Sequence, residues 1–521
     1  MNTKKFMAFL LTLVMAVTLL AGCGGGSGAE DSTGASGEGS GSGQDTLTIA
    51  QGSDATSLDP VAVNNVYSSN VMKQIYDNLV DLDKDGNVVP MLAESWEVSD
   101  DGLTFTFHLR EGVKFHNGDE MKASDVAFSL KRAQESAAVS HIFGEIDPES
   151  FETPDDYTVS FKLTAANAGF LAGLAHTGAG ITSEKVVTEE GENYTNNPVG
   201  TGPFKFVSWS KNATIELERF EDYYGTKPEL TKMTFRIITE ATNRAIELES
   251  GGVDMAFDIS TNDISRVEEN SDLQLIRKVD NQTTYLAFNC EKEPYNNPKV
   301  RQAIAYAIDT QSVVDAVWRG LGQAAVGPVA PSVKFFDDSL TVHEYNVEKA
   351  KELLKEAGVE NLTMTISTND RQERIDMATI IQSQLKEVGI TVEIEKLEWG
   401  ALLEKADRRE QDTIMLGWTC QSSDPDLALY APFHSQKNGA VGNNYANYSN
   451  ATVDELLEKG RVTTDEAERE QIYKDLQATI NEDTPWVYLN NGEVVVGAKA
   501  NLTGFEPTAY GYHTLYNITF K

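Results

Sequence analysis

Hydrophobic and polar residues alternate strictly in two short stretches near the start of the chain. Residues 103–109 (LTFTFHL) and 157–163 (YTVSFKL) place every second side chain on an apolar face. This period predicts half-buried β-strands. Between them, residues 124–133 (SDVAFSLKRA) repeat apolar side chains at helical spacing, and we expect Ser124 to cap that helix.

Strands and helices alternate more regularly after residue 340. Asn346 is expected to cap a helix that Gly358 ends. The predicted elements are, in order, a helix (346–358), a strand (362–366), a second helix (378–389) and two more strands (392–394 and 414–416). Such alternation predicts a largely parallel sheet covered by helices, within an α/β fold.

The last predicted strand runs into GWTCQSSDPDL, residues 417–427, where a tryptophan precedes short polar side chains. Asp424-Pro425 would suit a turn. The alternative is a binding site, because ligands of open α/β sheets collect beyond the carboxyl ends of strands. The candidate ligand residues in this segment are Trp418, Thr419, Cys420, Gln421 and Asp424.

The N-terminus has the composition of an export signal. Lys4 and Lys5 precede an apolar run, residues 6–20, and small residues lead to Cys23. We expect a lipoprotein signal peptide over 1–22 and a lipid on Cys23; the alternative is a plain signal peptide with an incidental cysteine. Residues 23–45 are rich in Gly and Ser and predict a disordered tether. The rest of the chain would then lie outside the cytoplasm, anchored to the cell membrane.

The remaining chain is too long for one hydrophobic core, so we expect at least two lobes. The formal net charge of −37 argues against nucleic acid or bare anionic lipid as a partner. Cys290 and Cys420 are the only cysteines after Cys23, and two such distant residues give no disulfide framework. We expect two free, buried thiols, although a pair remains an alternative.

No catalytic constellation is visible in the sequence. The motifs G-x-x-x-x-G-K-[ST], H-E-x-x-H, C-x-x-C and G-x-S-x-G are absent. The seven histidines are scattered without metal-ligand spacing, and His108 falls on the polar phase of a strand. We therefore expect a binding protein with no metal and no cofactor rather than an enzyme; a surface hydrolase is the alternative in which sequence-distant carboxylates meet.

Six segments in order resemble the extracytoplasmic solute-binding proteins of ABC importers, in the peptide/nickel-type class. They are MLAESWEVSDDGLTFTFHLREGVKFHNGDEMKASDVAFSLKR (91–132), NPVGTGPFKFVSW (197–209), VRQAIAYAIDTQSVVDAVWRG (300–320), AKELLKEAG (350–358), IIQSQLKEVGITVEIEKLEW (380–399) and YSNATVDELLEKG (448–460). The resemblance extends from about residue 46 to the end of the chain.

This resemblance implies a periplasmic-binding-protein-like fold, with two lobes, a hinge, an extra segment, and mixed sheets covered by helices. The implied parts are 46–83, 198–280 and 488–521 for lobe I, 84–197 for the extra segment, and 281–487 for lobe II. It also implies a monomer that closes on a small solute and passes it to the permease and ATPase subunits of an importer. A peptide-sensing receptor without transport is the alternative.

In peptide-binding members of the class, an aspartate in the segment resembling GWTCQSSDPDL holds the peptide ammonium. The corresponding residue here is Gln421, which has no charge to offer. Either another acid, with Asp424 the nearest, replaces it, or the ligand has no free amino group there. We expect an oligo- or dipeptide; a neutral polar solute such as an oligosaccharide is the alternative.

The resemblance implies further ligand residues elsewhere in the chain. The loop GSDATSLDP (52–60) would line the cleft, and Tyr285 would stand at the lobe junction. Arg371 or Arg374 would bind a carboxylate through a planar fork. The complete set outside 417–427 is Thr56, Ser57, Tyr285, Arg371, Arg374 and Trp399. Packing in the core or hinge is an equal alternative for Trp399 and Trp418.

Overall fold

A computed structural model describes residues 44–84, 86–340, 343–420, 422–437 and 443–521. The predicted signal peptide, Cys23 and nearly all of the predicted tether lie outside the described residues, as does Gln421. In the described part of the chain, no helix has the length and apolar character that crossing a membrane requires.

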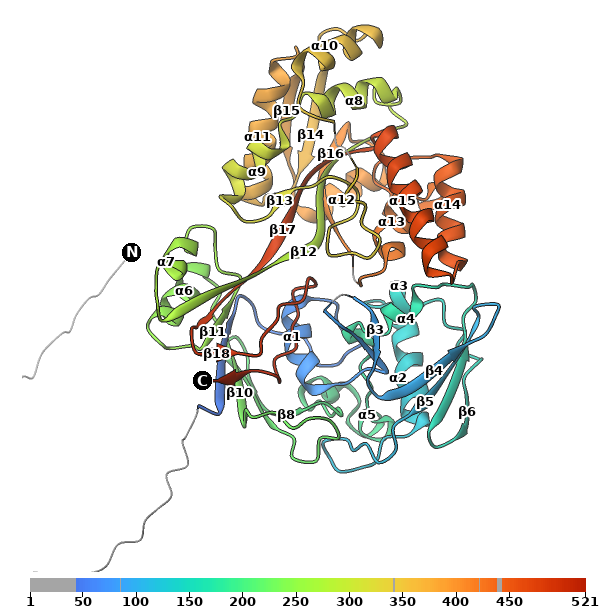
Figure 1. The fold of residues 1–521 in the computed structure, drawn as a ribbon, viewed down its shortest axis with the longest axis vertical. Helices are drawn as coiled ribbons and strands as arrows, with labels where there is room; N and C mark the ends of the chain where they lie inside the picture. The colour runs from blue at the N-terminus through green and yellow to red at the C-terminus, as the bar shows by residue number, and fades with distance from the viewer. Residues whose placement is uncertain (1–43, 85, 341–342, 421, 438–442) are drawn as a thin grey trace, which may run out of the picture. The chain divides into compact units, whose positions relative to one another are not determined.

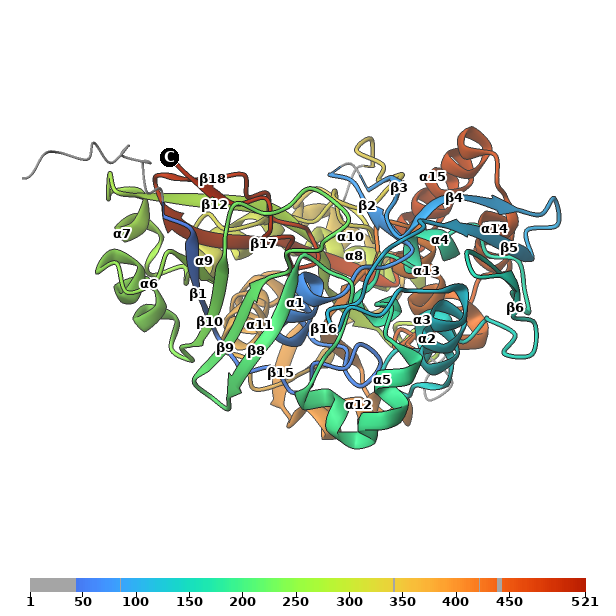
Figure 2. The ribbon, with the colours of Figure 1, turned by 90° about the horizontal axis from the view of Figure 1, so that it is seen from below.

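The largest sheet has 11 strands in the order β15-β14-β16-β12-β17-β11-β1-β10-β9-β8, with β13 paired to β17. Two long antiparallel strands, β12 (Leu273–Phe288) and β17 (Trp486–Lys499), connect its two halves. Figures 1 and 2 show these strands side by side along their length. Below, the half containing β14 to β16 is called the second half, and the half containing β1 the first half.

The second half contains the predicted parallel strands. β14 pairs in parallel with both β15 and β16, and helices flank the sheet (Figure 1). Its strands and helices are β13 (Gln323–Ala324), β14 (Thr363–Thr368), β15 (Thr391–Lys396), β16 (Thr413–Thr419), α8 (Pro298–Tyr306), α9 (Thr310–Trp318), α10 (Val347–Glu356), α11 (Gln372–Lys386), α12 (Trp399–Asp407), α13 (Pro425–Phe433), α14 (Ala451–Val462) and α15 (Glu466–Asp483). Asn346 caps α10 through Lys349 N, as predicted, and Gly358 adopts φ +71° just beyond that helix.

The first half combines parallel and antiparallel strands. β1 lies between β10 and β11 and is parallel to both, whereas β9 and β8 continue the sheet antiparallel. The elements are β1 (Thr46–Gln51), β8 (Phe204–Ser210), β9 (Thr214–Arg219), β10 (Lys232–Ile237), β11 (Met255–Phe257), α1 (Val66–Ile75), α6 (Ala241–Glu249), α7 (Ile264–Glu268), β18 (Leu502–Thr503) and β19 (Thr519–Phe520). The observed α/β fold with mixed sheets confirms the predicted fold class.

A separate antiparallel sheet, β4-β5-β7-β6, packs with α2 around its own hydrophobic core. Its central strands β5 and β7 fall within the two stretches that alternate in the sequence, and the core-facing residues of α2 are buried. The helices and strands of this part of the chain are β2 (Val80–Leu82), β3 (Val88–Pro90), β4 (Ala93–Val98), β5 (Thr104–Leu109), β6 (Glu152–Asp155), β7 (Thr158–Lys162), α2 (Ala123–Glu135), α3 (Ser140–Phe143), α4 (Phe170–Gly173) and α5 (Glu184–Glu190). β2 and β3 pair with each other in a two-stranded sheet. Ser124 does not cap α2, because the N-cap is Lys122 and Asp125 accepts from its backbone N–H.

Candidate ligand-binding site

Strand β16 ends in the segment that the sequence singled out. Trp418 is half-buried, and its indole Nε1 donates to Leu427 O in α13 at 3.1 Å. Thr419 is exposed, and its hydroxyl accepts from Gln282 Nε2 at 2.8 Å. The chain therefore leaves the sheet with one aromatic side chain anchored to a helix and one hydroxyl open to solvent.

Asp424 has a structural role instead of the predicted ligand role. Its two carboxylate oxygens accept from Arg469 Nη1 and Nη2 at 2.6 and 2.8 Å, and both side chains are buried. It also caps α13 by accepting from Asp426 N. Because its charge is already paired, Asp424 does not fit the role of a substitute acid for a ligand ammonium.

Cys290 and Cys420 are both free thiols, as expected from the sequence. Cys420 is buried, and its thiol donates to the backbone oxygen of Asp424 at 3.2 Å. Burial raises the pKa of both thiols, to about 11 for Cys290. Cys420 therefore packs beneath the segment rather than facing a ligand, and Cys290 is only partly buried.

Arg374, in the first turn of α11, is a buried cation that forms no ion pair with a carboxylate of the described residues. It is 8% exposed, and its one hydrogen bond to a described residue is a long contact of 3.4 Å from Nη1 to Asn369 Oδ1. Burial, and then the charge of Arg371, lower the pKa of Arg374 to about 10. The side chain therefore retains unused donors and an unbalanced charge, which is a common property of ligand-binding positions.

The residues around Arg374 lie at the carboxyl edge of the sheet. A Cβ placed on Gly417 would lie 2.8 Å from Gln282 Oε1 and 3.4 Å from Arg374 Nη2, so the glycine permits the close approach of the Gln282 side chain and lies beside the guanidinium. Trp399, at the start of α12, is 46% exposed, and its ring centroid lies 5.9 Å from the guanidinium carbon. Arg371 is more exposed than Arg374. The predicted residues Arg371, Arg374, Trp399 and Thr419 thus lie on one edge of the second half.

The first half presents a second group of side chains toward this edge. Burial and the charge of Asp258 raise the pKa of Tyr67, at the start of α1, and two arginines oppose that shift. One is Arg244 of the first half, and the other is Arg371 of the second half. Tyr67 therefore lies within electrostatic reach of charged side chains in both halves.

The sequence reasoning did not single out Arg244 or Tyr67, two residues of the first half that lie close to charged side chains of this region. Arg244 is buried and donates to four backbone carbonyls, at Ile238, Thr239, Phe257 and Asp258. It therefore holds together the loops beyond β10 and β11. Its signal in the sequence is weak, because a lone arginine in an amphipathic helix usually reads as a solvated residue.

Three other predicted ligand residues have different environments. Thr56 is exposed, and its hydroxyl accepts from Asn65 Nδ2 at 3.0 Å, close to the start of α1. Ser57 is buried and bonds to Thr195 within the first half. Tyr285 is 1% exposed and stacks on Trp486 with ring centroids 3.5 Å apart. The structure thus makes Ser57 and Tyr285 packing residues and leaves Thr56 accessible.

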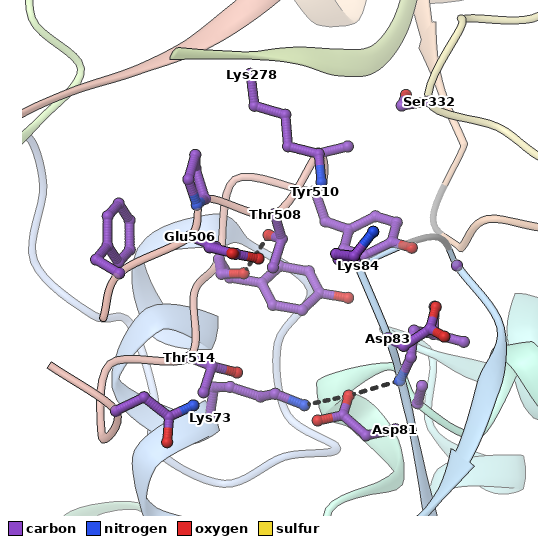
Figure 3. Close-up of a pocket in the computed structure, with 18 of the residues that line it drawn as sticks. Lys73, Asp81, Asp83, Lys84, Lys278, Ser332, Glu506, Thr508, Tyr510 and Thr514 are labelled. Atoms are coloured by element: carbon purple, nitrogen blue, oxygen red, sulfur yellow. Dashed lines mark hydrogen bonds and ion pairs between the residues drawn. The ribbon is translucent and has the colours of Figure 1, made fainter. Parts of the chain in front are cut away.

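A pocket of about 780 Å³ lies between the hairpin β2–β3, strand β12 and the C-terminal segment. Figure 3 shows it with Lys278 of β12 and Ser332 on one side and Lys73 and Asp81 on the other. Lys73 Nζ pairs with Asp81 Oδ1 at 2.8 Å. The C-terminal segment 504–517 supplies much of the remaining wall. The pocket therefore borders both halves of the large sheet.

Comparison with known proteins points to one class. A family model described as "Bacterial extracellular solute-binding proteins, family 5 Middle" matches residues 87–440, more than half of the chain. The chain is 34% identical over 470 residues to the glutathione-binding protein GsiB of Pectobacterium atrosepticum, covering 88% of this chain and 90% of that protein. It is 32% identical over 478 residues to the dipeptide-binding protein of Escherichia coli, covering 86% and 89%.

A solved structure gives the same picture. The ABC transporter-associated periplasmic binding protein DppA from Helicobacter pylori, in complex with the peptide STSA, superimposes with a TM-score of 0.76 at 31% identity. The match covers 91% of this chain and 98% of that one. The similarity therefore includes both halves of the large sheet and the separate antiparallel sheet.

Proposed function

Because the chain belongs to the bacterial extracellular solute-binding proteins of family 5, we propose that it captures a peptide by closure of two lobes and delivers it to the permease and ATPase of an ABC importer. The lobes would be those expected from the sequence, with β12 and β17 as the hinge. A ligand drives such closure only by binding the closed state more tightly, so it must contact both lobes.

Arg374 is the observation that carries this proposal. A buried guanidinium without an acidic partner is costly in a folded protein, unless a ligand supplies the missing anion. The planar fork suits a carboxylate, and a peptide always has one at its end unless it is blocked. Trp399 beside it offers an exposed aromatic face to the residue that carries the carboxylate. The names of the relatives, which include binders of a dipeptide and of glutathione, agree with a ligand of this kind.

The location of the protein follows from the N-terminal sequence. A basic start, an apolar run and Cys23 support a lipid anchor on that cysteine after removal of residues 1–22. The Gly/Ser-rich stretch would then serve as a flexible tether between the membrane and the folded part of the chain. Radiolabelled palmitate incorporated by wild type and not by Cys23→Ala would support the anchor, whereas equal labelling would argue against it.

The binding proposal is tested by thermal unfolding of the protein lacking residues 1–45. Trialanine at about a hundredfold its Kd should stabilise the protein by about 2.7 kcal/mol, and trialanine amide should do so less. A neutral disaccharide should leave Tm unchanged. If the disaccharide raises Tm and no peptide does, the cargo is a neutral polar solute, which the uncharged Gln421 at the family's ammonium position would suit.

Transport and sensing are separated by a growth experiment. Deletion of the gene should abolish growth on the bound peptide as sole source of an essential amino acid, if the protein feeds an importer. Unchanged uptake after deletion would favour a sensing receptor. Native mass spectrometry of the protein as purified would identify any cargo that it retains.

A further inference from the structure

Arg461, in the last turn of α14, links the second half to the part of the chain that carries the separate antiparallel sheet. Its Nη1 lies 3.1 Å from Glu145 Oε1, in the connection between α3 and β6. Its backbone oxygen accepts from Ala168 N, just before α4, at 2.7 Å. The last carbonyls of a helix have no partner within the helix, so the Ala168 amide satisfies one of them from outside the second half. Figures 1 and 2 show α13 close to α4, on the opposite side of the molecule from α6 and α7.

Both members of this ion pair are held by their own part of the chain. Arg461 Nε and Nη2 each donate to the Asp426 carboxylate at 3.1 Å, and the guanidinium carbon lies 3.9 Å from the centroid of the Tyr430 ring. On the other side, Glu145 Oε2 accepts from Asn167 Nδ2 at 2.9 Å. Because the two side chains are already fixed, their pairing costs little side-chain entropy. Both are mostly buried, so salt screens this pair less than a pair on the open surface.

Gly169, next to Ala168, permits the close approach of the two parts. A Cβ placed on Gly169 would lie 2.6 Å from Asp424 Oδ1 and 2.7 Å from Asp424 Cγ. The Asp424 carboxylate is fixed by both terminal nitrogens of Arg469, so it cannot turn aside without losing that pair. The φ angle of Gly169 is −80°, which any residue adopts. A side chain at this position would therefore be excluded by the neighbouring part of the chain and not by the backbone conformation.

We propose that these contacts act as a clasp, which stabilises the closed arrangement of the two halves independently of the ligand. The clasp consists of Glu145, Ala168, Gly169, Asp424 and Arg461. None of these residues belongs to the proposed carboxylate site around Arg374. The free energy of the clasp would add to closure whatever ligand is bound, so it would raise the affinity for every ligand by the same factor. The effect on affinity rests on the proposed binding function, whereas the clasp itself does not.

Hydrogen–deuterium exchange of the full-length protein without ligand tests the clasp directly. In the wild type, the Ala168 amide hydrogen should exchange more slowly than an unstructured amide, because it is bonded to Arg461 O. Gly169→Ala, which separates the two parts, should speed this exchange about threefold or more. Glu145→Gln removes the ion pair without adding bulk and should act in the same direction, which covers the case in which Gly169→Ala fails to fold. Glu149→Gln is the matched control, because it removes the same charge from an exposed position in the same connection and should leave the exchange rate unchanged.

Calorimetric titration with trialanine and its C-terminal amide tests the effect on affinity. Glu145→Gln should raise the Kd of both by the same factor, about threefold to tenfold, whereas a change at the carboxylate site would affect the acid more than the amide. If the Ala168 amide exchanges at the unstructured rate in the wild type, or if the folded variants leave its exchange unchanged, the clasp is overturned. If exchange responds and neither Kd changes, the role of the clasp in affinity is overturned. If neither compound binds the wild type, the peptide-binding function fails, and the exchange rates still decide whether the clasp forms.

Discussion

Replacing Arg374 by methionine should weaken peptide binding while leaving the free protein at least as stable. Met keeps much of the volume of the side chain and removes the charge. Truncating one partner of a buried charge pair costs about 2–5 kcal/mol of binding energy, which corresponds to roughly 30-fold to several-thousand-fold in Kd. Within the part of the chain that the structure describes, the cation has one long hydrogen bond and no ion-pair partner, so its removal relieves an unfavourable burial.

The assay combines calorimetric titration with thermal unfolding, on trialanine and its C-terminal amide. Wild type should bind the acid more tightly than the amide, and Arg374→Met should bind the two alike. The four affinities form a double-mutant cycle that assigns the lost binding free energy to the contact between Arg374 and the carboxylate. Arg371→Met, at a more exposed position than Arg374, is the matched control and should have a smaller effect. The reasoning is refuted if Arg374→Met lowers the affinities of acid and amide equally, or if it lowers Tm by many degrees in the free protein.

Three further predictions concern stability, pH and ligand choice. Arg469→Met should destabilise the protein by about 3–5 kcal/mol, since Asp424 is left buried and unpaired; an unchanged denaturation midpoint would contradict this. Burial raises the pKa of Asp77 to about 7, so the folded state holds this proton more tightly than the unfolded state, and stability falls as pH rises from about 4 to about 7. Asp77→Asn should therefore match wild type near pH 4 and exceed it at pH 8 by up to about 4 kcal/mol; equal Tm values at pH 8 would contradict this. Gln421→Asp should raise the affinity for dialanine, and a loss measured by calorimetry would argue against the alignment with ammonium-binding relatives.

Local patterns in the sequence predicted much of the fold, because they depend on neighbours in the chain. The cap at Asn346 and the helix end at Gly358 follow from side-chain and backbone chemistry within a few residues. The N-terminus of α2 differed from prediction, because Asp125 accepts from the Lys122 backbone and starts the helix earlier than Ser124 would.

The site was harder to predict, because it depends on partners that are distant in sequence. Asp424 reads as an available acid until Arg469, 45 residues further on, occupies both of its oxygens. Tyr285 reads as a junction residue until Trp486 covers its ring. Arg374 is one of four described arginines without an ion-pair partner, and the other three, Arg244, Arg301 and Arg319, form shorter hydrogen bonds to protein oxygens. No sequence pattern shows that difference.

A crystal structure of the protein with hexa-alanine would test the central claim most directly. We predict that the peptide carboxylate lies on the Arg374 guanidinium and that the peptide also contacts the first half of the large sheet. A peptide bound with its carboxylate elsewhere, and Arg374 paired with a side chain of the protein, would contradict the account.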